Sequence, residues 1–282
     1  MKAVELYERI ERDFNLAICS DEWVMEPNEY ITEQFLKRSM GLVTDCSDTI
    51  SYVYTAVFPS ADVISKIISD GRRDALLFVH HPMNWDITKF PVFSDVPAAL
   101  LEKLRERKIS IYNLHVPLDA NGPYGTTANL AAALGVDATG EFYEYFGVKV
   151  GVIGTTDCGD VNALKNRFEE AVGHPVALYK YGEEEIRDGK VALIAGGGNT
   201  ADVYPFLREM GINAYLTGIA AINEDFAPSV EAHEAAKAGG VNILAGSHYS
   251  TEKFACMKMV EYFAGLGIAG EFAADKPGME DM

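Results

Sequence analysis

The sequence lacks several features that would assign the chain to a special class. Its four cysteines lie far apart and include no Cys-x-x-Cys pair, which argues against a zinc knuckle and against a disulfide framework. No run approaches the roughly 18 to 20 apolar residues that span a bilayer, and the first residues lack the apolar core of a signal peptide. We therefore expect a cytoplasmic protein with no membrane partner.

Positive charge is also scarce. The chain has 24 Lys and Arg residues against 42 Asp and Glu residues, a net charge of −18 over 282 residues. Such a field repels a phosphate backbone, and no local run of Lys or Arg overcomes it. We therefore expect a small-molecule substrate rather than nucleic acid. The same field attracts cations, which agrees with a metal site.

Short apolar runs alternate with longer amphipathic segments along most of the chain. The expected strands cover residues 51–57, 75–79, 109–116, 148–154, 191–198, 212–218 and 241–246. The expected helices cover residues 61–70, 96–108, 160–172, 200–210 and 228–239, with a last helix beginning near Thr251. This alternation predicts an α/β fold of parallel or mixed sheets flanked by helices.

The strand–helix rhythm pauses once, at residues 136–147, which are aromatic and turn-like. We take this pause as the domain boundary. The prediction is a first α/β lobe over residues 1–140 and a second α/β lobe over residues 141–250. Residues 251–282 are expected to form a C-terminal helical segment that packs back on the first lobe.

Histidines gather in three clusters, each after an apolar strand. His80 and His81 lie in HHPMNW, His115 lies in HVPLDANGPYG, and His248 lies in GSHYSTEKF. In open α/β sheets, ligands bind in the crevice at the carboxyl ends of the strands. Segments that are distant in the sequence can therefore meet at one site.

The spacing within each cluster limits what it can bind. Neighbouring side chains on an extended backbone point in opposite directions, so His80 and His81 would not easily share one small ion. They could reach two ions, or one ion and a structural partner. The pairs His115–Asp119 and His248–Glu252 are four residues apart, a spacing that can bring both side chains to one side of a helical turn. Imidazole and carboxylate ligands without thiolate suit zinc, iron, manganese or nickel.

A glycine run and one further histidine offer competing interpretations. GGGNTA, at residues 196–201, follows a strand and resembles a dinucleotide-binding loop. The next strand ends in YLTG and lacks the acidic residue that would bind a ribose hydroxyl, so we favour a tight turn whose amides face the active site. His233 lies on an expected helix and could transfer protons or could be an ordinary surface or interface histidine. His174, in GHP, is interpreted as a turn residue.

Together, VHHPMNW, HVPLDANGPYGTTANLAAALG and GSHYSTEKF resemble the Nif-three-like dinuclear metal-centre family, whose members are often described as homologues of GTP cyclohydrolase 1 type 2. The resemblance runs from about Gly41 onward. The chain departs from the family pattern at TGIAA, where many members have a Gly-Glu pair. It implies a two-lobed α/β protein with a dinuclear metal site between the lobes, and a homohexamer. The implied metal ligands are listed here: His80, His81, Asp119, His248 and Glu252.

These features predict a hydrolase that depends on two divalent metal ions and acts on a nucleotide-like or other small phosphorylated substrate. A GTP cyclohydrolase activity is what the resemblance implies. The resemblance also implies that His115 lies at the site, as a further ligand or as a proton shuttle. His115 and His233 are the candidates for proton transfer. The alternative is a non-catalytic metal-binding or regulatory protein that keeps the same ligands.

Overall fold

The computed structural model describes residues 1–282, which divide into two compact units. Unit 1 comprises Met1–Ala120, Tyr145–Val148 and Ala255–Lys276. Unit 2 comprises Asn121–Glu144, Lys149–Phe254 and Pro277–Met282. Each unit contains its own sheet and its own hydrophobic core.

Unit 1 is built on a five-stranded mixed sheet in the order β1-β6-β3-β2-β13. Its strands are β1 (Gly41–Thr44), β2 (Tyr52–Ala56), β3 (Ala75–Val79), β6 (Ile109–Asn113) and β13 (Ala269–Phe272). All neighbours are parallel except β1, which runs antiparallel to β6. The expected strands at 51–57, 75–79 and 109–116 are thereby confirmed, the last ending earlier than predicted.

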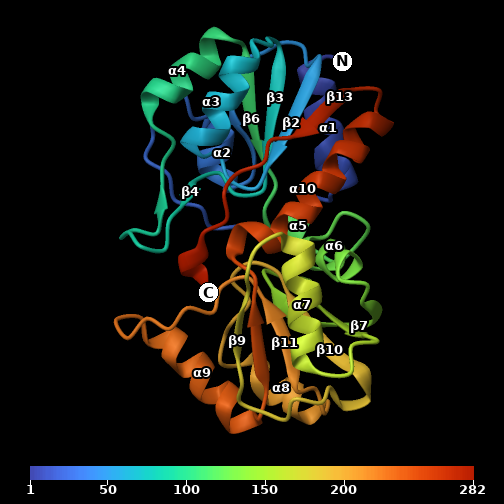
Figure 1. The fold of residues 1–282 in the computed structure, drawn as a ribbon. Coiled ribbons are helices and arrows are strands. Elements are labelled where there is room, and N and C mark those ends of the chain that lie inside the picture. The colour runs from blue at the N-terminus through green and yellow to red at the C-terminus, as the bar shows by residue number, and fades with distance from the viewer. The chain divides into compact units, whose positions relative to one another are not determined.

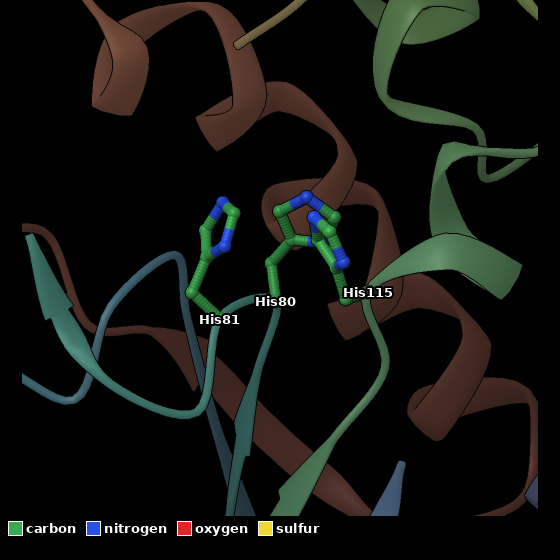
Figure 2. Close-up of side chains that lie close together, drawn as sticks. All are labelled: His80, His81 and His115. Atoms are coloured by element: carbon green, nitrogen blue, oxygen red, sulfur yellow. The ribbon is translucent and has the colours of Figure 1, made fainter. Parts of the chain in front are cut away.

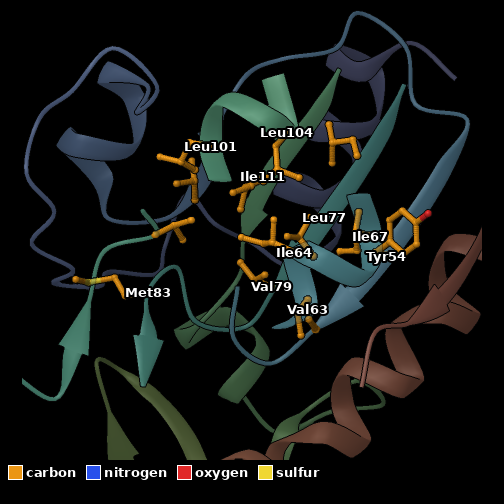
Figure 3. Packing of buried hydrophobic residues seen from close by; sticks show 14 of the residues in the cluster. Tyr54, Val63, Ile64, Ile67, Leu77, Val79, Met83, Leu101, Leu104 and Ile111 are labelled. Atoms are coloured by element: carbon orange, nitrogen blue, oxygen red, sulfur yellow. The ribbon is translucent and has the colours of Figure 1, made fainter. Parts of the chain in front are cut away.

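Helices cover both faces of this sheet. The helices are α1 (Ala3–Asp13), α2 (Glu33–Arg38), α3 (Ala61–Asp70), α4 (Ala98–Glu106), α5 (Val116–Asp119) and α10 (His248–Gly265), of which α10 enters unit 1 at Ala255. Leu77 and Val79 pack with α3 and α4 on one face (Figures 1 and 3). Phe78, between them in sequence, points to the other face and contacts Phe263 of α10. The continuous apolar run of β3 is therefore buried on both sides.

Unit 2 contains a six-stranded sheet in the order β7-β8-β10-β11-β12-β9. Its strands are β7 (Asp137–Tyr145), β8 (Val148–Thr155), β9 (Ala177–Tyr179), β10 (Lys190–Ile194), β11 (Ala214–Thr217) and β12 (Asn242–Ala245). The central strands β10, β11 and β12 are parallel, whereas β8 runs antiparallel to β10 and β9 runs antiparallel to β12. The fold class predicted from the sequence, mixed sheets flanked by helices, is confirmed.

The helices of unit 2 also lie on both faces of their sheet. They are α6 (Thr126–Ala133), α7 (Val161–Val172), α8 (Val203–Glu209) and α9 (Ala227–Gly239). Leu216 packs with α6 and α7, whereas its neighbour Tyr215 contacts Tyr204 of α8 on the opposite face. Asp160 caps the N-terminus of α7, where its carboxylate accepts from two backbone N–H groups, and Gly173 follows the last turn in the left-handed region. Short elements complete the chain: the hairpin strands β4 (Asn84–Trp85) and β5 (Phe93–Ser94), and the 3₁₀ turns η1 (Arg187–Gly189) and η2 (Met279–Asp281).

Two local expectations are wrong. Residues 137–145 form the edge strand β7 instead of a turn, and most of its side chains are exposed, so the alternation of apolar and polar residues that marks a strand is absent. Helix α10 begins at His248 rather than near Thr251. The hydroxyl of Ser247 accepts from the backbone N–H of Ser250 and caps the helix. No helix in the structure is both long and apolar enough to cross a membrane.

Candidate metal centre

Three buried histidines converge in unit 1. His80 and His81 follow the end of β3, and His115 immediately precedes α5 (Figure 2). Each offers one ring nitrogen, and these three ligand atoms lie within 4.8 Å of one another. The chain bends directly after Val79 instead of remaining extended, so the rings of His80 and His81 lie 4.4 Å apart, centroid to centroid. The expectation that these two side chains point in opposite directions is therefore wrong.

The tautomer of His80 follows from its contacts. Its Nδ1 lies 3.0 Å from the carbonyl oxygen of Leu114, which can only accept a hydrogen bond, so Nδ1 carries the proton. In the neutral ring, Nε2 then carries a lone pair. That atom lies 3.3 Å from Oδ1 of Asp119. A lone pair facing a carboxylate oxygen is favourable only when a proton or another cation lies near both atoms.

In His115, as in His80, one ring nitrogen is held by a hydrogen bond and the other faces Asp119. The group that holds the first nitrogen of His115 is a carboxylate. Its Nδ1 donates to Oδ2 of Asp21 at 2.9 Å, and its Nε2 lies 3.5 Å from Oδ2 of Asp119. The side chain of Asp21 is almost fully buried and also accepts from the indole N–H of Trp23. Both oxygens of Asp119 therefore face imidazole nitrogens. A histidine whose other N–H is held by a carbonyl or carboxylate is the usual arrangement of a metal ligand.

Aromatic side chains enclose the histidines. The Trp23 ring lies edge-on to His81 and His115, with centroids 5.5 Å and 5.0 Å away. Phe58 stacks on His81 at 4.7 Å. Phe93 contacts Trp23 in turn, at 4.8 Å. These rings lower the access of water to the imidazoles, which strengthens electrostatic interactions there.

Unit 2 contains a separate histidine–carboxylate pair on the first turns of α10. Nε2 of His248 lies 3.2 Å from Oε1 of Glu252, and both side chains are buried. The four-residue spacing predicted that they share one side of the helix, and the distance confirms it. A buried carboxylate needs a compensating positive charge or hydrogen bonds. This pair is thus a second candidate for holding a cation.

The glycine run supports this pair. Gly196 has a φ of +67°, and a Cβ atom on it would lie 2.1 Å from Oε1 of Glu252 and 3.3 Å from Cδ2 of His248. Only glycine leaves this space for the carboxylate. Its backbone N–H donates to the hydroxyl of Thr251, which fixes the loop against α10. Within unit 2, the run therefore serves the His248–Glu252 pair.

The two remaining histidines have other partners. In His233, on α9, Nε2 donates to the carbonyl of Ala220 at 2.8 Å and Nδ1 accepts from the hydroxyl of Tyr181 at 2.9 Å. Burial lowers the pKa of His233 below its ordinary value of 6.5. Nε2 of His174 lies 2.7 Å from the hydroxyl of Ser250. Proton transfer by His233 stays a prediction.

Sequence reasoning missed Asp21 and Trp23. Asp21 is separated from His115 by 94 residues and lies outside any regular element, so no periodic pattern marked it. It also missed Asp281, which accepts a hydrogen bond from the backbone N–H of His248. An acidic residue four positions from a histidine can be recognised in the sequence. The contacts of Asp21 and Asp281 join distant segments and exist only in the folded chain.

Sequence comparison identifies relatives over most of the chain. The family described as Duf34/NIF3 (NGG1p interacting factor 3) matches residues 35–272. A protein of Archaeoglobus fulgidus named GTP cyclohydrolase 1 type 2 homolog is 31% identical over 236 residues, which are 82% of this chain and 87% of the relative. A protein of the same name from Pyrococcus horikoshii is 28% identical over 218 residues, 77% of this chain and 80% of the relative.

Solved structures share the fold. A crystal structure of a Thermus thermophilus protein matches with a TM-score of 0.70 at 20% identity, covering 99% of this chain and 100% of that one. A Staphylococcus aureus protein matches with a TM-score of 0.68 at 18% identity, covering 98% and 97%. The motif resemblance, the family match and the sequence relatives agree: the chain belongs to the Duf34/NIF3 family.

Proposed function

We propose that this chain is a hydrolase that depends on two divalent metal ions. The proposed ligands are the five predicted ones: His80, His81, Asp119, His248 and Glu252. The observation that carries the proposal is the pairing of His80 with Asp119, in which an imidazole whose proton is committed elsewhere faces a carboxylate oxygen. That pairing is explained by a cation held between the two groups.

The donor set fits such ions. It consists of imidazole nitrogens and carboxylate oxygens, which suit zinc, iron, manganese and nickel. None of the four cysteines is among the proposed ligands, and Cys256 donates its thiol hydrogen to the carbonyl of Ala56. When bound, such ions supply Lewis-acid activation of water and positive charge for substrate oxygens. With a net charge of −18, the chain supplies little positive charge of its own for a phosphorylated substrate.

His115 is assigned the transfer of a proton. Asp21 holds its Nδ1–H, so Nε2 is the atom that accepts a proton, and the carboxylate then stabilises the imidazolium. Trp23 donates to the same carboxylate and keeps it oriented. These contacts give His115 a fixed tautomer and orientation, as proton transfer requires.

The substrate class is nucleotide-like or otherwise small and phosphorylated. GTP is the first compound to test, because the curated relatives carry the name GTP cyclohydrolase 1 type 2 homolog. Opening of the guanine imidazole ring would release formate. A panel of simple phosphate esters tests the broader class of two-metal phosphoesterases.

The deciding experiment measures metal content and turnover on the same samples. Protein loaded separately with zinc, iron(II), manganese and nickel is analysed by elemental analysis, and formate and phosphate release are then followed. We expect two ions per chain and turnover that is lost in Glu252→Gln. In His115→Gln we expect unchanged metal content with lost turnover, whereas a loss of metal would make His115 a ligand.

Two results contradict the proposal in different ways. Less than one ion per chain in every preparation would reject the metal centre itself. Two bound ions without turnover of GTP or any phosphate ester would reject the hydrolase and leave the non-catalytic metal-binding protein.

A further inference from the structure

Asp281 is an ionisable residue that the fold buries almost completely. Its exposed fraction is 1%, and it lies in the 3₁₀ turn η2, within the short segment Pro277–Met282 that belongs to unit 2. Its Oδ2 accepts from the backbone N–H of His248 at 2.9 Å. A buried carboxylate is retained only where it is held by hydrogen bonds or charge. The contact with His248 is therefore the first place to seek its role.

The N–H of His248 is one of the donors that the start of a helix leaves without an intrahelical acceptor. Ser247 satisfies the N–H of Ser250, and Asp281 satisfies that of His248 from 33 residues further along the chain. A negative charge at this end of α10 also interacts favourably with the helix dipole. Asp281 thus fixes the backbone of the residue that carries the imidazole.

The backbone of Asp281 extends this restraint to the second ligand of unit 2. Its carbonyl oxygen accepts from the N–H groups of Ala220 and Ala221, at 2.8 Å and 2.9 Å. The same loop returns to the glycine run, because Gly218 donates to the carbonyl of Gly196 at 3.0 Å. Gly196 in turn borders the carboxylate of Glu252. Asp281 therefore contacts both the start of α10, which carries His248, and the loop that leads back to Gly196 beside Glu252.

We propose that Asp281 is a positioning residue for His248 and Glu252, and that docking of the segment Pro277–Met282 is coupled to metal binding. The inference rests on the proposed function, in which these two residues are ligands. Coupling of two binding events is reciprocal. A docked segment raises metal affinity, and bound metal holds the segment in place.

The test compares Asp281→Ala and Asp281→Asn with the matched control Glu280→Gln in the full chain. Glu280 is the exposed neighbour of Asp281, so its variant removes the same charge without touching His248. Zinc affinity is measured by competition with a chromophoric chelator. We expect Asp281→Ala to weaken zinc binding by about 10–100-fold, the usual range for an outer partner of a ligand. Asp281→Asn should lose less, because its amide oxygen can still accept from the His248 N–H, and Glu280→Gln should match the wild type.

Hydrogen exchange separates positioning from a general loss of stability. In the wild type, zinc should slow exchange in peptides that cover residues 247–252 and in peptides that cover residues 277–282. In Asp281→Ala, zinc should no longer slow exchange at residues 277–282. If that variant fails to fold, Asp281→Asn tests the same coupling with a side chain of equal size, and zinc should then slow exchange at residues 277–282 less than in the wild type.

The outcomes are distinct. Unchanged zinc affinity in folded Asp281 variants, even with a lower melting temperature, overturns the positioning role and leaves the proposed function standing. Equal weakening in Glu280→Gln also overturns it, because the effect would then be one of general charge. A wild-type chain that binds no zinc, manganese, iron or nickel overturns the proposed function and this inference together.

Discussion

Buried histidines occur in both units, but their surroundings differ. In unit 1, the rings of His80, His81 and His115 face one another, with centroids between 4.4 Å and 5.0 Å apart. In unit 2, the ring of His233 lies between a tyrosine hydroxyl and a backbone carbonyl, which occupy both of its nitrogens. Both environments exclude water. Burial alone therefore does not distinguish a ligand from a residue of the core.

The environments of His233 and His80 differ in the group that lies opposite the second ring nitrogen. His233 has one donor and one acceptor opposite its two nitrogens, which is the complete complement of a neutral imidazole. His80 has an acceptor opposite each nitrogen, the carbonyl of Leu114 and the carboxylate of Asp119. The first arrangement is satisfied without any ion. The second brings a nitrogen lone pair and a carboxylate oxygen together, an arrangement that a cation between them stabilises.

The largest expected effect follows from removing one of the unit 1 nitrogens. Because loss of an outer partner of a ligand reduces metal affinity by about 10–100-fold, we expect His80→Ala to lower it by more than ~100-fold. His233→Ala should retain the metal content of the wild type. Elemental analysis after dialysis against a weak chelator measures both, and circular dichroism checks that each variant folds. Equal metal loss in the two variants would remove the distinction between the two environments.

A second, smaller effect is expected at the glycine run. Gly196→Ala places a Cβ 2.1 Å from Oε1 of Glu252 and forces a side chain into the left-handed region. The backbone strain is about 1–2 kcal/mol and the overpacking about 1–3 kcal/mol. We expect a lower free energy of unfolding in urea and weaker metal binding. The control is Gly197→Ala, since a Cβ at that position would have only an ordinary contact, 3.8 Å from Ile219.

If Gly196→Ala and Gly197→Ala behaved alike, the space beside Glu252 would have no special role. A fall in stability without any change in metal affinity would restrict that role to backbone conformation. Either result would reduce the contrast between the two units, because the glycine that borders Glu252 has no counterpart beside the histidines of unit 1.

The sequence predicts those parts of the fold that repeat a local pattern. Helix α3 was placed correctly at residues 61–70, because Val63, Ile64 and Ile67 recur on one face. Strand β7 was missed, because its side chains are exposed and show no alternation. Antiparallel edge strands such as β1 and β9 are short and gave no signal against the stronger parallel pattern.

The residues of the candidate site also fall into those that a sequence pattern marks and those that no pattern marks. His80, His81 and His115 could be found because they follow apolar strands, and the strand ends meet at one edge of the unit 1 sheet. Asp21 and Asp281 could not be found, since neither has a periodic position or a motif of its own. Their roles depend on contacts across 94 and 33 residues. The sequence indicates which residues carry the chemistry more readily than which residues hold them in place.

A third prediction concerns Asp21, the residue that distinguishes His115 from the other histidines of unit 1. In Asp21→Asn, the side-chain amide can turn its NH₂ group toward His115 and favour the other tautomer. We expect a reduction of about 10-fold in turnover, at the lower end of the range for such outer partners. The control is Glu22→Gln, the exposed neighbour. The measurement is the pH profile of turnover together with metal content. Loss of metal instead of turnover would place His115 among the ligands.

The smallest effect is expected at His233, and it is one of stability. Burial lowers the pKa of His233 in the folded chain, whereas in the unfolded chain it returns to about 6.5. As the pH falls below 6.5, the unfolded chain therefore binds this proton more readily than the folded chain, and the free energy of unfolding decreases.

His233→Gln cannot take up the proton, so its stability should fall less steeply between pH 7.5 and pH 5.5. The difference in slope is at most about 1.4 kcal/mol per pH unit, the limit for one proton. Urea denaturation at both pH values measures it. Equal slopes in the wild type and the variant would mean that burial of His233 does not keep it neutral, and the contrast with the histidines of unit 1 would then lose its physical basis.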